Sequence, residues 1–169
     1  MRSILNINWD SNLPIYNISQ SELQQKGINS LLLDVDGTLV NRKSNMIPKA
    51  VKNWIIESKK LFTLYLISNN PSNKRIAKIA KELNLRYKYN ASKPRKKVTL
   101  SAIKEIGIES KNIAIIGDRI FTDIIVGNRC DIKTILVKRL NRDGFPIKFN
   151  LTLTIEKVIS HFIKWKLGL

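Results

Sequence analysis

The alternation of short apolar runs with segments of helical periodicity constrains the fold of this sequence more than any other feature. Apolar runs lie at residues 31–33, 61–67, 113–116 and 132–137, with a weaker run at 85–89. Helical patterns separate them, beginning at Pro48 and Asn70 and covering residues 94–106 and 122–128. Alternation of this kind is typical of a parallel sheet with helices on both faces. We therefore expect an α/β fold with a mainly parallel central sheet between two layers of helices.

The length of 169 residues allows one domain with a substantial core and is too short for two of ordinary size. We expect a single domain over residues 1–169, with an N-terminal extension at 1–27 and a C-terminal amphipathic helix at about 152–167. No apolar run is long enough to cross a bilayer, and no signal peptide is evident. A single cysteine, Cys130, fits a reducing compartment and is expected to be a small buried side chain. These features favour a cytoplasmic protein.

The charge is strongly positive, because 30 Lys and Arg residues face 13 Asp and Glu residues, giving a net charge of +17 and a pI near 10.2. Such an excess favours an anionic partner, which could be nucleic acid, an acidic membrane surface or a phosphorylated substrate. An AT-rich coding sequence would also enrich lysine, although it does not readily account for so few acidic residues.

Polar residues gather where three of the expected strands end. The sequence DVDGT occupies residues 34–38, SNN occupies 68–70 and GDR occupies 117–119, while Lys93 lies in a loop that enters a helix. In open parallel sheets, ligands bind beyond the carboxyl ends of the strands, near the point where the strand order reverses. We therefore expect these clusters to share one rim of the sheet.

The carboxylates of Asp34 and Asp36 lie close together in the sequence and repel each other, so the fold must offset this repulsion or use the two residues in another way. A hairpin turn at Asp-Gly is one interpretation of this stretch. A calcium loop is excluded, because its fifth and sixth positions would be Thr38 and Leu39. The second acidic cluster at 117–123 favours a shared hard cation, and Mg²⁺ prefers a few carboxylates, water and substrate phosphate.

These residue types also suggest a reaction. A phosphate held against Asp34 by a metal ion would be open to attack by its carboxylate, giving an aspartyl-phosphate. Asp36 could protonate the leaving oxygen and later deprotonate the hydrolytic water. Gly37 would let the backbone approach the phosphate, and Lys93 would add positive charge. The expected phosphate-binding residues are Thr38, Ser68, Asn69 and Lys93.

The motifs, in this order, resemble those of the haloacid dehalogenase (HAD) superfamily in its phosphatase branch. They are DVDGT at 34–38, Ser68, Lys93 with Pro94, and GDRIFTD at 117–123, and the resemblance covers roughly residues 28–138. It implies a Rossmann-like three-layer sandwich with Asp34 as nucleophile and Asp36 as acid and base. It also implies a magnesium site made by Asp34, the backbone carbonyl of Asp36 and Asp118. Asp123 would orient this site or pair with Lys93. Without the resemblance, Asp123 could cap its helix, Ser68 could be a turn residue and Lys93 a solvated loop charge.

The spacing of the motifs leaves no room for the cap domains that this superfamily inserts to enclose small substrates. An open site suits a phosphate on something large, or a partner that closes the site. The stretch at 117–137 is similar to YqeG-type members of the capless subclass IIIA phosphatases, although Gln is more usual than Arg119 and Gly more usual than Asp131. Eukaryotic relatives of this group convert phosphatidylglycerophosphate to phosphatidylglycerol.

The C-terminal segment at 151–169 allows two interpretations. It places Ile155, Val158, Ile159, Phe162 and Ile163 on one helical face, with its lysines largely elsewhere. Such a helix suits the interface of an anionic membrane, or it could cover the core of its own domain. The basic run KPRKK at 93–97 could likewise attract an anionic head group or be a solvated loop. His161 is expected to be a surface or packing residue.

The resulting hypothesis is a magnesium-dependent phosphatase that acts on phosphatidylglycerophosphate, located in the cytoplasm with peripheral contact at the inner membrane face. One alternative substrate is a phosphorylated nucleic-acid end or a soluble phosphate ester. A second alternative is a non-catalytic protein that binds RNA or another partner on a phosphatase scaffold. Nucleic acid is the weaker expectation, because the sequence contains no recognisable RNA-binding motif. The sequence leaves the oligomeric state open.

Overall fold

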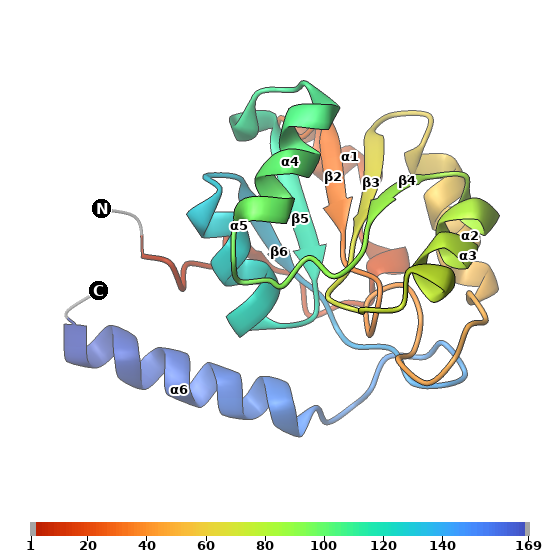
Figure 1. Cartoon of the computed structure of the whole chain (residues 1–169). Helices are drawn as coiled ribbons and strands as arrows, with labels where there is room; N and C mark the ends of the chain where they lie inside the picture. The colour runs from red at the N-terminus through yellow and green to blue at the C-terminus, as the bar shows by residue number, and fades with distance from the viewer. Residues whose placement is uncertain (1–2, 168–169) are drawn as a thin grey trace.

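The computed structural model describes residues 3–167 and contains one sheet of six parallel strands (Figure 1). The strand order across the sheet is β1-β6-β5-β2-β3-β4. The strands are β1 (Trp9–Asp10), β2 (Ser30–Leu33), β3 (Thr63–Ile67), β4 (Arg86–Lys88), β5 (Ile113–Gly117) and β6 (Lys133–Leu136). The expectation of an α/β fold with a parallel central sheet is confirmed. The short edge strand β1 was not predicted from the sequence.

Helices cover both faces of the sheet, which gives the three layers expected from the alternating pattern. They are α1 (Gln20–Gln25), α2 (Lys49–Ser58), α3 (Asn73–Leu83), α4 (Lys97–Ile106), α5 (Ile125–Arg129) and α6 (Leu151–Leu167). The core residues of α1, α2 and α3 pack in one cluster against one face, and those of α4 and α5 pack in a second cluster. Helix α6 lies outside these layers, along the lower edge of the molecule in Figure 1.

Strand β2 explains why an uninterrupted apolar run marks the centre of this sheet. Leu31 and Leu33 belong to the cluster beneath α2 and α3, whereas Leu32 belongs to the opposite cluster. Successive side chains of a strand point to opposite faces, and both faces are covered here, so every position of the strand must be apolar.

Local signals fix the starts of the helices closely, with one correction. Ser19 caps α1, since its hydroxyl accepts from the backbone N–H of Glu22. Helix α3 is capped by Ser72, whose hydroxyl accepts from the N–H of Arg75. The helix that the sequence pattern placed from Asn70, with Asn70 as its cap, therefore begins later, at Asn73. The sequence allowed either residue, because both can act as N-caps and Pro71 tolerates only the positions around a helix start.

The connections of the sheet determine where a ligand site can form. The chain passes from β2 to β3 and β4 on one side, then returns to place β5 on the other side of β2. The strand order therefore reverses between β2 and β5, and Asp34 and Asp118 each follow one of these strands. Within residues 3–167 no separate cap domain is evident, and no helix there has the length and hydrophobicity to cross a bilayer.

Candidate active site

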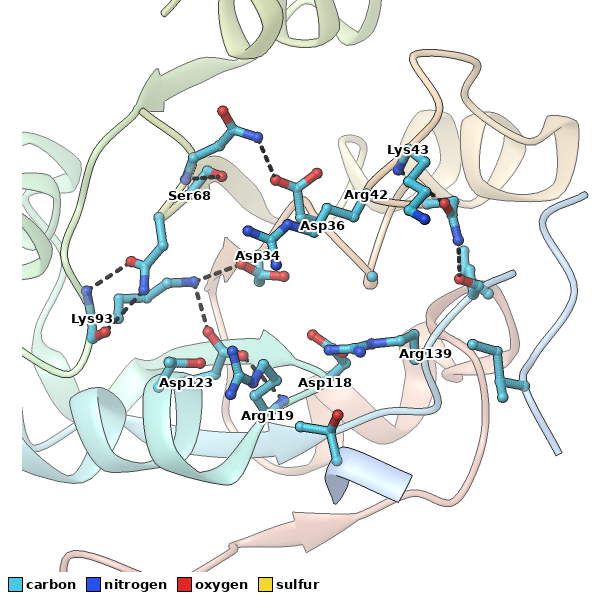
Figure 2. Close-up of a pocket in the computed structure, with 18 of the residues that line it drawn as sticks. Asp34, Asp36, Arg42, Lys43, Ser68, Lys93, Asp118, Arg119, Asp123 and Arg139 are labelled. Atoms are coloured by element: carbon cyan, nitrogen blue, oxygen red, sulfur yellow. Dashed lines mark hydrogen bonds and ion pairs between the residues drawn. The ribbon is translucent and has the colours of Figure 1, made fainter. Parts of the chain in front are cut away.

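A cavity of about 540 Å³ lies beyond the carboxyl ends of β2, β3 and β5. Its inner part is acidic, with Asp34, Asp36, Asp118 and Asp123 among the lining residues. Besides Lys93, five basic residues also line it, namely Arg42, Lys43, Arg119, Arg139 and Arg142. Figure 2 shows the acidic residues between Lys93 and several of these basic residues. The cavity therefore combines an acidic centre with a basic margin.

Lys93 joins two of the acidic side chains. Its Nζ lies 2.7 Å from Oδ1 of Asp34 and 2.6 Å from Oδ1 of Asp123, and it also donates to the carbonyl oxygen of Ile67 at 3.1 Å. Lys93 is only 4% exposed, so the interpretation of this residue as a solvated loop charge was wrong. Asp123 does more than cap a helix, because each of its two oxygens has a different partner. Its second oxygen accepts from the N–H of Arg119 at 3.2 Å, while the first pairs with Lys93.

The buried ionisable groups have displaced pKa values. Burial raises the pKa of Asp34 to about 7, with Lys93 acting against the shift and the carboxylates of Asp123 and Asp118 adding to it. Burial raises the pKa of Asp118 to about 6, assisted by Asp123 and opposed by Arg139. Burial alone would lower the pKa of Lys93, but Asp123 and Asp34 outweigh it and raise that pKa. The three carboxylates together hold more negative charge than the nearby cations offset.

The arrangement of Asp34, Asp118 and Asp123 fits a divalent metal ion. One oxygen from each lies within 4.8 Å of the others, and all three side chains are buried. Oxygen donors of this kind suit Mg²⁺, whose remaining positions are usually filled by water and substrate phosphate. Arg139 lies against the same site, with its Nε 2.5 Å from Oδ2 of Asp118. The donor set therefore fits the expected magnesium, with Asp123 closer to the ligand set than the sequence indicated.

The side chain of Asp36 is held by another set of contacts. Its Oδ1 accepts from Nη1 of Arg75 at 2.5 Å, and its Oδ2 accepts from Nδ2 of Asn70 at 2.8 Å. Arg75 also donates to the carbonyl oxygens of Asn41 and Ser44, which belong to the loop between β2 and α2. Asp36 lines the cavity but lies outside the acidic group that could hold a metal. Its carboxylate is thus oriented at the cavity wall by donors to both of its oxygens.

The expected phosphate-binding residues divide into two groups. Ser68 and Asn69 line the cavity with Lys93, and Asn69 exchanges two hydrogen bonds with the backbone of Lys93, at 2.7 and 2.9 Å. Thr38 is fully buried and does not line the cavity, and its hydroxyl donates to Oδ2 of Asp34 at 3.0 Å. Within the structure Thr38 therefore positions Asp34.

Two glycines are required by the packing of the acidic side chains. Gly37 has a φ of +101°, and a Cβ there would meet Oδ2 of Asp118 at 2.7 Å. A Cβ on Gly117 would lie 2.3 Å from Cγ of Asp123. Gly37, which follows β2, thus makes room for Asp118 of the neighbouring strand β5. Gly117, at the end of β5, makes room for Asp123, which follows the same strand.

Sequence reasoning missed three residues that shape this site: Arg75, Arg139 and Glu156. Arg75 holds Asp36, Arg139 pairs with Asp118, and Glu156 of α6 accepts from Nε of Arg119 at 3.1 Å. None belongs to a motif, and each reaches its partner across 21 to 39 residues of sequence. No local sequence signal distinguishes these three residues from other charged residues of the chain.

Comparison with family models and curated proteins supports one class of protein. The HAD-hydrolase-like family model matches residues 90–142, a segment that contains Lys93, Asp118 and Asp123. The protein named probable phosphatase YqeG of Bacillus subtilis (strain 168) is 29% identical over 154 residues, covering 90% of this chain and 88% of that protein.

Solved structures share the fold at low sequence identity. An uncharacterised protein from Listeria monocytogenes serotype 4b aligns with a TM-score of 0.55 and 18% identity, covering 75% of this chain and 86% of that one. The putative HAD-hydrolase YfnB from Bacillus subtilis, solved bound to magnesium, aligns with a TM-score of 0.53 and 13% identity, covering 71% of this chain and 90% of that one.

Together with these similarities, the parallel sheet and the acidic cavity at its reversal point support an enzyme of the HAD hydrolase type. The chain resembles HAD-type hydrolases in the segment 90–142, and it is similar to YqeG over most of its length.

Proposed function

We propose that this chain is a magnesium-dependent phosphomonoester hydrolase that works through an aspartyl-phosphate on Asp34. The observation that carries the proposal is the buried group of Asp34, Asp118 and Asp123 with Lys93 among them, in a cavity with a basic margin. The similarity to a protein named as a probable phosphatase supports the same class of reaction.

In the first half of the proposed reaction, an oxygen of the Asp34 carboxylate attacks the phosphorus of the substrate. The bond between phosphorus and the leaving oxygen breaks, and Asp36 donates a proton to that oxygen. Thr38 holds the second oxygen of Asp34, which fixes the direction of the nucleophile. Lys93 contacts Asp34 from the cavity side and offsets the negative charge of the phosphoryl group as it arrives.

In the second half, water attacks the phosphorus of the aspartyl-phosphate and gives a proton to Asp36. The bond between phosphorus and the Asp34 oxygen breaks, inorganic phosphate leaves, and the carboxylate is restored. Asp36 is therefore the acid in the first step and the base in the second, which a carboxylate lining the cavity can perform.

Asp34, Asp118 and Asp123 would hold the magnesium ion, with the backbone carbonyl of Asp36 as a further proposed ligand. When bound, Mg²⁺ supplies positive charge that draws phosphate oxygens toward the nucleophile and offsets the repulsion among the carboxylates. Arg139 pairs with Asp118 and lines the cavity, so its guanidinium group could also contact an oxygen of the substrate phosphate.

We propose phosphatidylglycerophosphate as the substrate and phosphatidylglycerol as the product. The support is the resemblance to capless phosphatases of this type, together with the absence of a separate cap domain from the described residues and the basic cavity margin. An uncapped cavity suits a phosphate carried on a large molecule, and a basic margin suits a substrate with more than one negative charge.

The test offers the purified protein with Mg²⁺ three substrates: phosphatidylglycerophosphate in vesicles, a terminally phosphorylated oligonucleotide and a small aryl phosphate. Selective phosphate release from the vesicles supports the proposed substrate. Preference for the oligonucleotide would transfer the same chemistry to nucleic acid, and tight RNA binding without turnover of any substrate would overturn the enzymatic proposal.

The nucleophile is tested with Asp34→Asn, which keeps the shape of the side chain and removes its charge. We expect turnover to fall by about 10³-fold or more, while the thermal unfolding temperature stays at or above that of the unaltered protein. Glu109→Gln, at an exposed residue far from the cavity, serves as the matched control with normal turnover. Normal activity of Asp34→Asn would show that the nucleophile is assigned wrongly.

A further inference from the structure

Helix α6 carries an apolar row that faces away from the rest of the protein. Leu151, Ile155, Val158, Ile159, Phe162 and Trp165 are all exposed, and their spacing of three and four residues places them along one side of the helix. We call these six residues the outer row. Trp165 is 74% exposed and Phe162 is 57% exposed, and their rings lie 5.8 Å apart. Of the two interpretations of this segment, the one in which its apolar face covers the core of its own domain does not hold for the outer row, although Ile163 packs against the body of the protein.

The opposite side of α6, which contacts the body of the protein, is partly polar. Glu156 and Ser160 are buried there, and Glu156 accepts from the N–H of Ile120 at 2.7 Å. Leu153 and Ile163 add apolar contacts to a small cluster with Leu5. An amphipathic helix normally turns its apolar face inward. The reversal leaves the outer row without a partner among the described residues.

The charge around the outer row indicates what kind of surface it fits. Lys148, in the loop before α6, and Lys166, in its last turn, are exposed, whereas Lys157 pairs with Asp10 and Lys164 is half-buried. Glu156 is the acidic residue in the described part of α6, and it is buried against Arg119. An exposed apolar row flanked by lysines, with a tryptophan near one end, fits the interface of an anionic bilayer.

The position of α6 relative to the cavity points to the same partner. Thr152, in the first turn of α6, lines the cavity, as does Ile147 in the preceding loop. In that loop Phe145 and Phe149 are also exposed. Figure 1 shows α6 passing below the edge of the sheet where the strands end. A bilayer against the outer row would therefore lie beside the mouth of the cavity.

We infer that the outer row docks this protein on anionic membrane lipid, so that a phosphate of that surface is presented to the cavity. The inference rests on the proposed function for its purpose, but the docking can be measured without it. Burial of the outer row in a second copy of the chain is disfavoured, because each copy carries a net charge of +17.

The test measures co-sedimentation with vesicles of phosphatidylcholine alone and of phosphatidylcholine mixed with phosphatidylserine. Neither lipid is a phosphomonoester, so failure of docking and failure of the phosphatase proposal give separate results. We expect binding to the mixed vesicles that weakens with added salt, and little binding to phosphatidylcholine alone. Equal binding to both vesicles, or binding to neither, would overturn the inference.

The matched variants are Phe162→Ser and Ile56→Ser, since the two side chains are exposed to a similar extent, 57% and 56%, and Ile56 lies on α2. Phe162→Ser should weaken vesicle binding by about tenfold or more, whereas Ile56→Ser should bind like the unaltered protein. Circular dichroism and thermal unfolding should show that both variants remain folded, because neither side chain is buried. Equal binding by the two variants would contradict the inference.

The fluorescence of Trp165 gives a second measurement on the same vesicles. The chain has two other tryptophans, of which Trp54 is buried and hydrogen-bonded and Trp9 is half-buried. A blue shift on vesicle addition that comes from Trp165 should be lost in Trp165→Phe, which keeps an aromatic side chain and leaves Trp9 and Trp54 in place. Sedimentation velocity decides the competing case. A dimer that Phe162→Ser converts to monomer, with no vesicle binding by either form, would assign the outer row to a second copy.

Discussion

The ion pair of Asp36 and Arg75 joins the loop after β2 to helix α3, and Asn70 in the loop after β3 adds a third contact. Nη1 of Arg75, on α3, donates to one oxygen of Asp36, while Nη2 donates to the carbonyl oxygens of Asn41 and Ser44. Asn70 holds the second oxygen of Asp36. The carboxylate proposed to move protons thus has both oxygens oriented by donors. Arg75 is a positioning residue for the reaction, since its effect on substrate passes through Asp36.

Replacement of Arg75 should separate positioning from binding. Arg75→Met should lower kcat by about ten- to hundredfold, which is less than the full rate gain that general acid catalysis usually provides. The change in KM should be smaller. Arg75→Lys should restore part of the loss. The loss should be larger for an alkyl phosphate than for a nitrophenyl phosphate, because a poor leaving group needs the proton more.

The control for this prediction is Lys78→Met, at an exposed lysine on the same helix. It should change neither kinetic constant. A purely structural role for Arg75 would lower turnover of both substrates by the same factor and leave Arg75→Lys no better than Arg75→Met.

Gly117 supports a prediction about the acidic group itself. In Gly117→Ala the new Cβ would lie 2.3 Å from Cγ of Asp123, so Asp123 must shift from the position in which it pairs with Lys93. We expect a loss of about 1–3 kcal/mol in the free energy of unfolding and a large loss of the stabilisation by added Mg²⁺. Thermal unfolding with and without the metal measures both effects.

Gly107→Ala is the matched control for this substitution. Gly107 ends α4 with a φ of +73°, and a Cβ there meets nothing within 4 Å. Alanine should cost about 1 kcal/mol through backbone strain and leave the response to Mg²⁺ intact. If both variants lose that response equally, the space beside Asp123 is not what matters.

At the scale of elements, the contact between α6 and the π-helical segment Ile120–Ile124 holds the C-terminal helix in place. Glu156 is 3% exposed, and its two oxygens accept from Arg119 and from the N–H of Ile120. That N–H lies at the start of the segment, where the helix itself supplies no acceptor. One side chain therefore completes the hydrogen bonding of a helix start and anchors α6.

Glu156→Ala should lower the free energy of unfolding by about 1–3 kcal/mol, because it leaves a buried N–H without a partner and removes the ion pair of a partly exposed arginine. Hydrogen exchange of the α6 backbone amides should speed up more than that of β2. Glu109→Ala, which removes an exposed ion pair with Lys111, should change stability by well under about 1 kcal/mol. Equal effects of the two substitutions would show that α6 is held by other contacts.

At the scale of the whole molecule, two buried carboxylates link folding to pH in the metal-free protein. Burial raises the pKa of Asp34 to about 7 and that of Asp118 to about 6, from an ordinary value of 3.8. Between pH 4 and 7 the folded protein therefore holds protons that the unfolded chain releases. The free energy of unfolding should fall as the pH rises through this window.

Urea unfolding in EDTA at pH 5 and pH 8 measures this dependence, and we expect the lower stability at pH 8. Added Mg²⁺ should stabilise the protein more at pH 8 than at pH 5, since it binds the ionised carboxylates. Asp34→Asn should flatten the profile because it removes one of the two groups. Higher stability at pH 8 in EDTA would contradict the assignment of these groups as buried and metal-free.

Much of this molecule follows from local sequence. The apolar runs around residues 31–33, 61–67 and 113–116 predict the central strands, because a strand covered on both faces must be apolar throughout. The motifs at the ends of those strands predict that Asp34, Asp118 and Lys93 meet, because parallel strands end at one edge. The spacing of the motifs along the chain and the common direction of the strands were sufficient for these two predictions.

The tertiary structure alone decided which partners the motif residues take and which way α6 faces. Arg75, Arg139 and Glu156 reach their partners across the fold, and no local pattern records such a contact. The periodicity of α6 shows that it has an apolar side, but the direction of that side depends on the contacts that Glu156, Leu153 and Ile163 make with the rest of the fold. Periodicity is a property of one helix, whereas orientation is set by what the helix packs against.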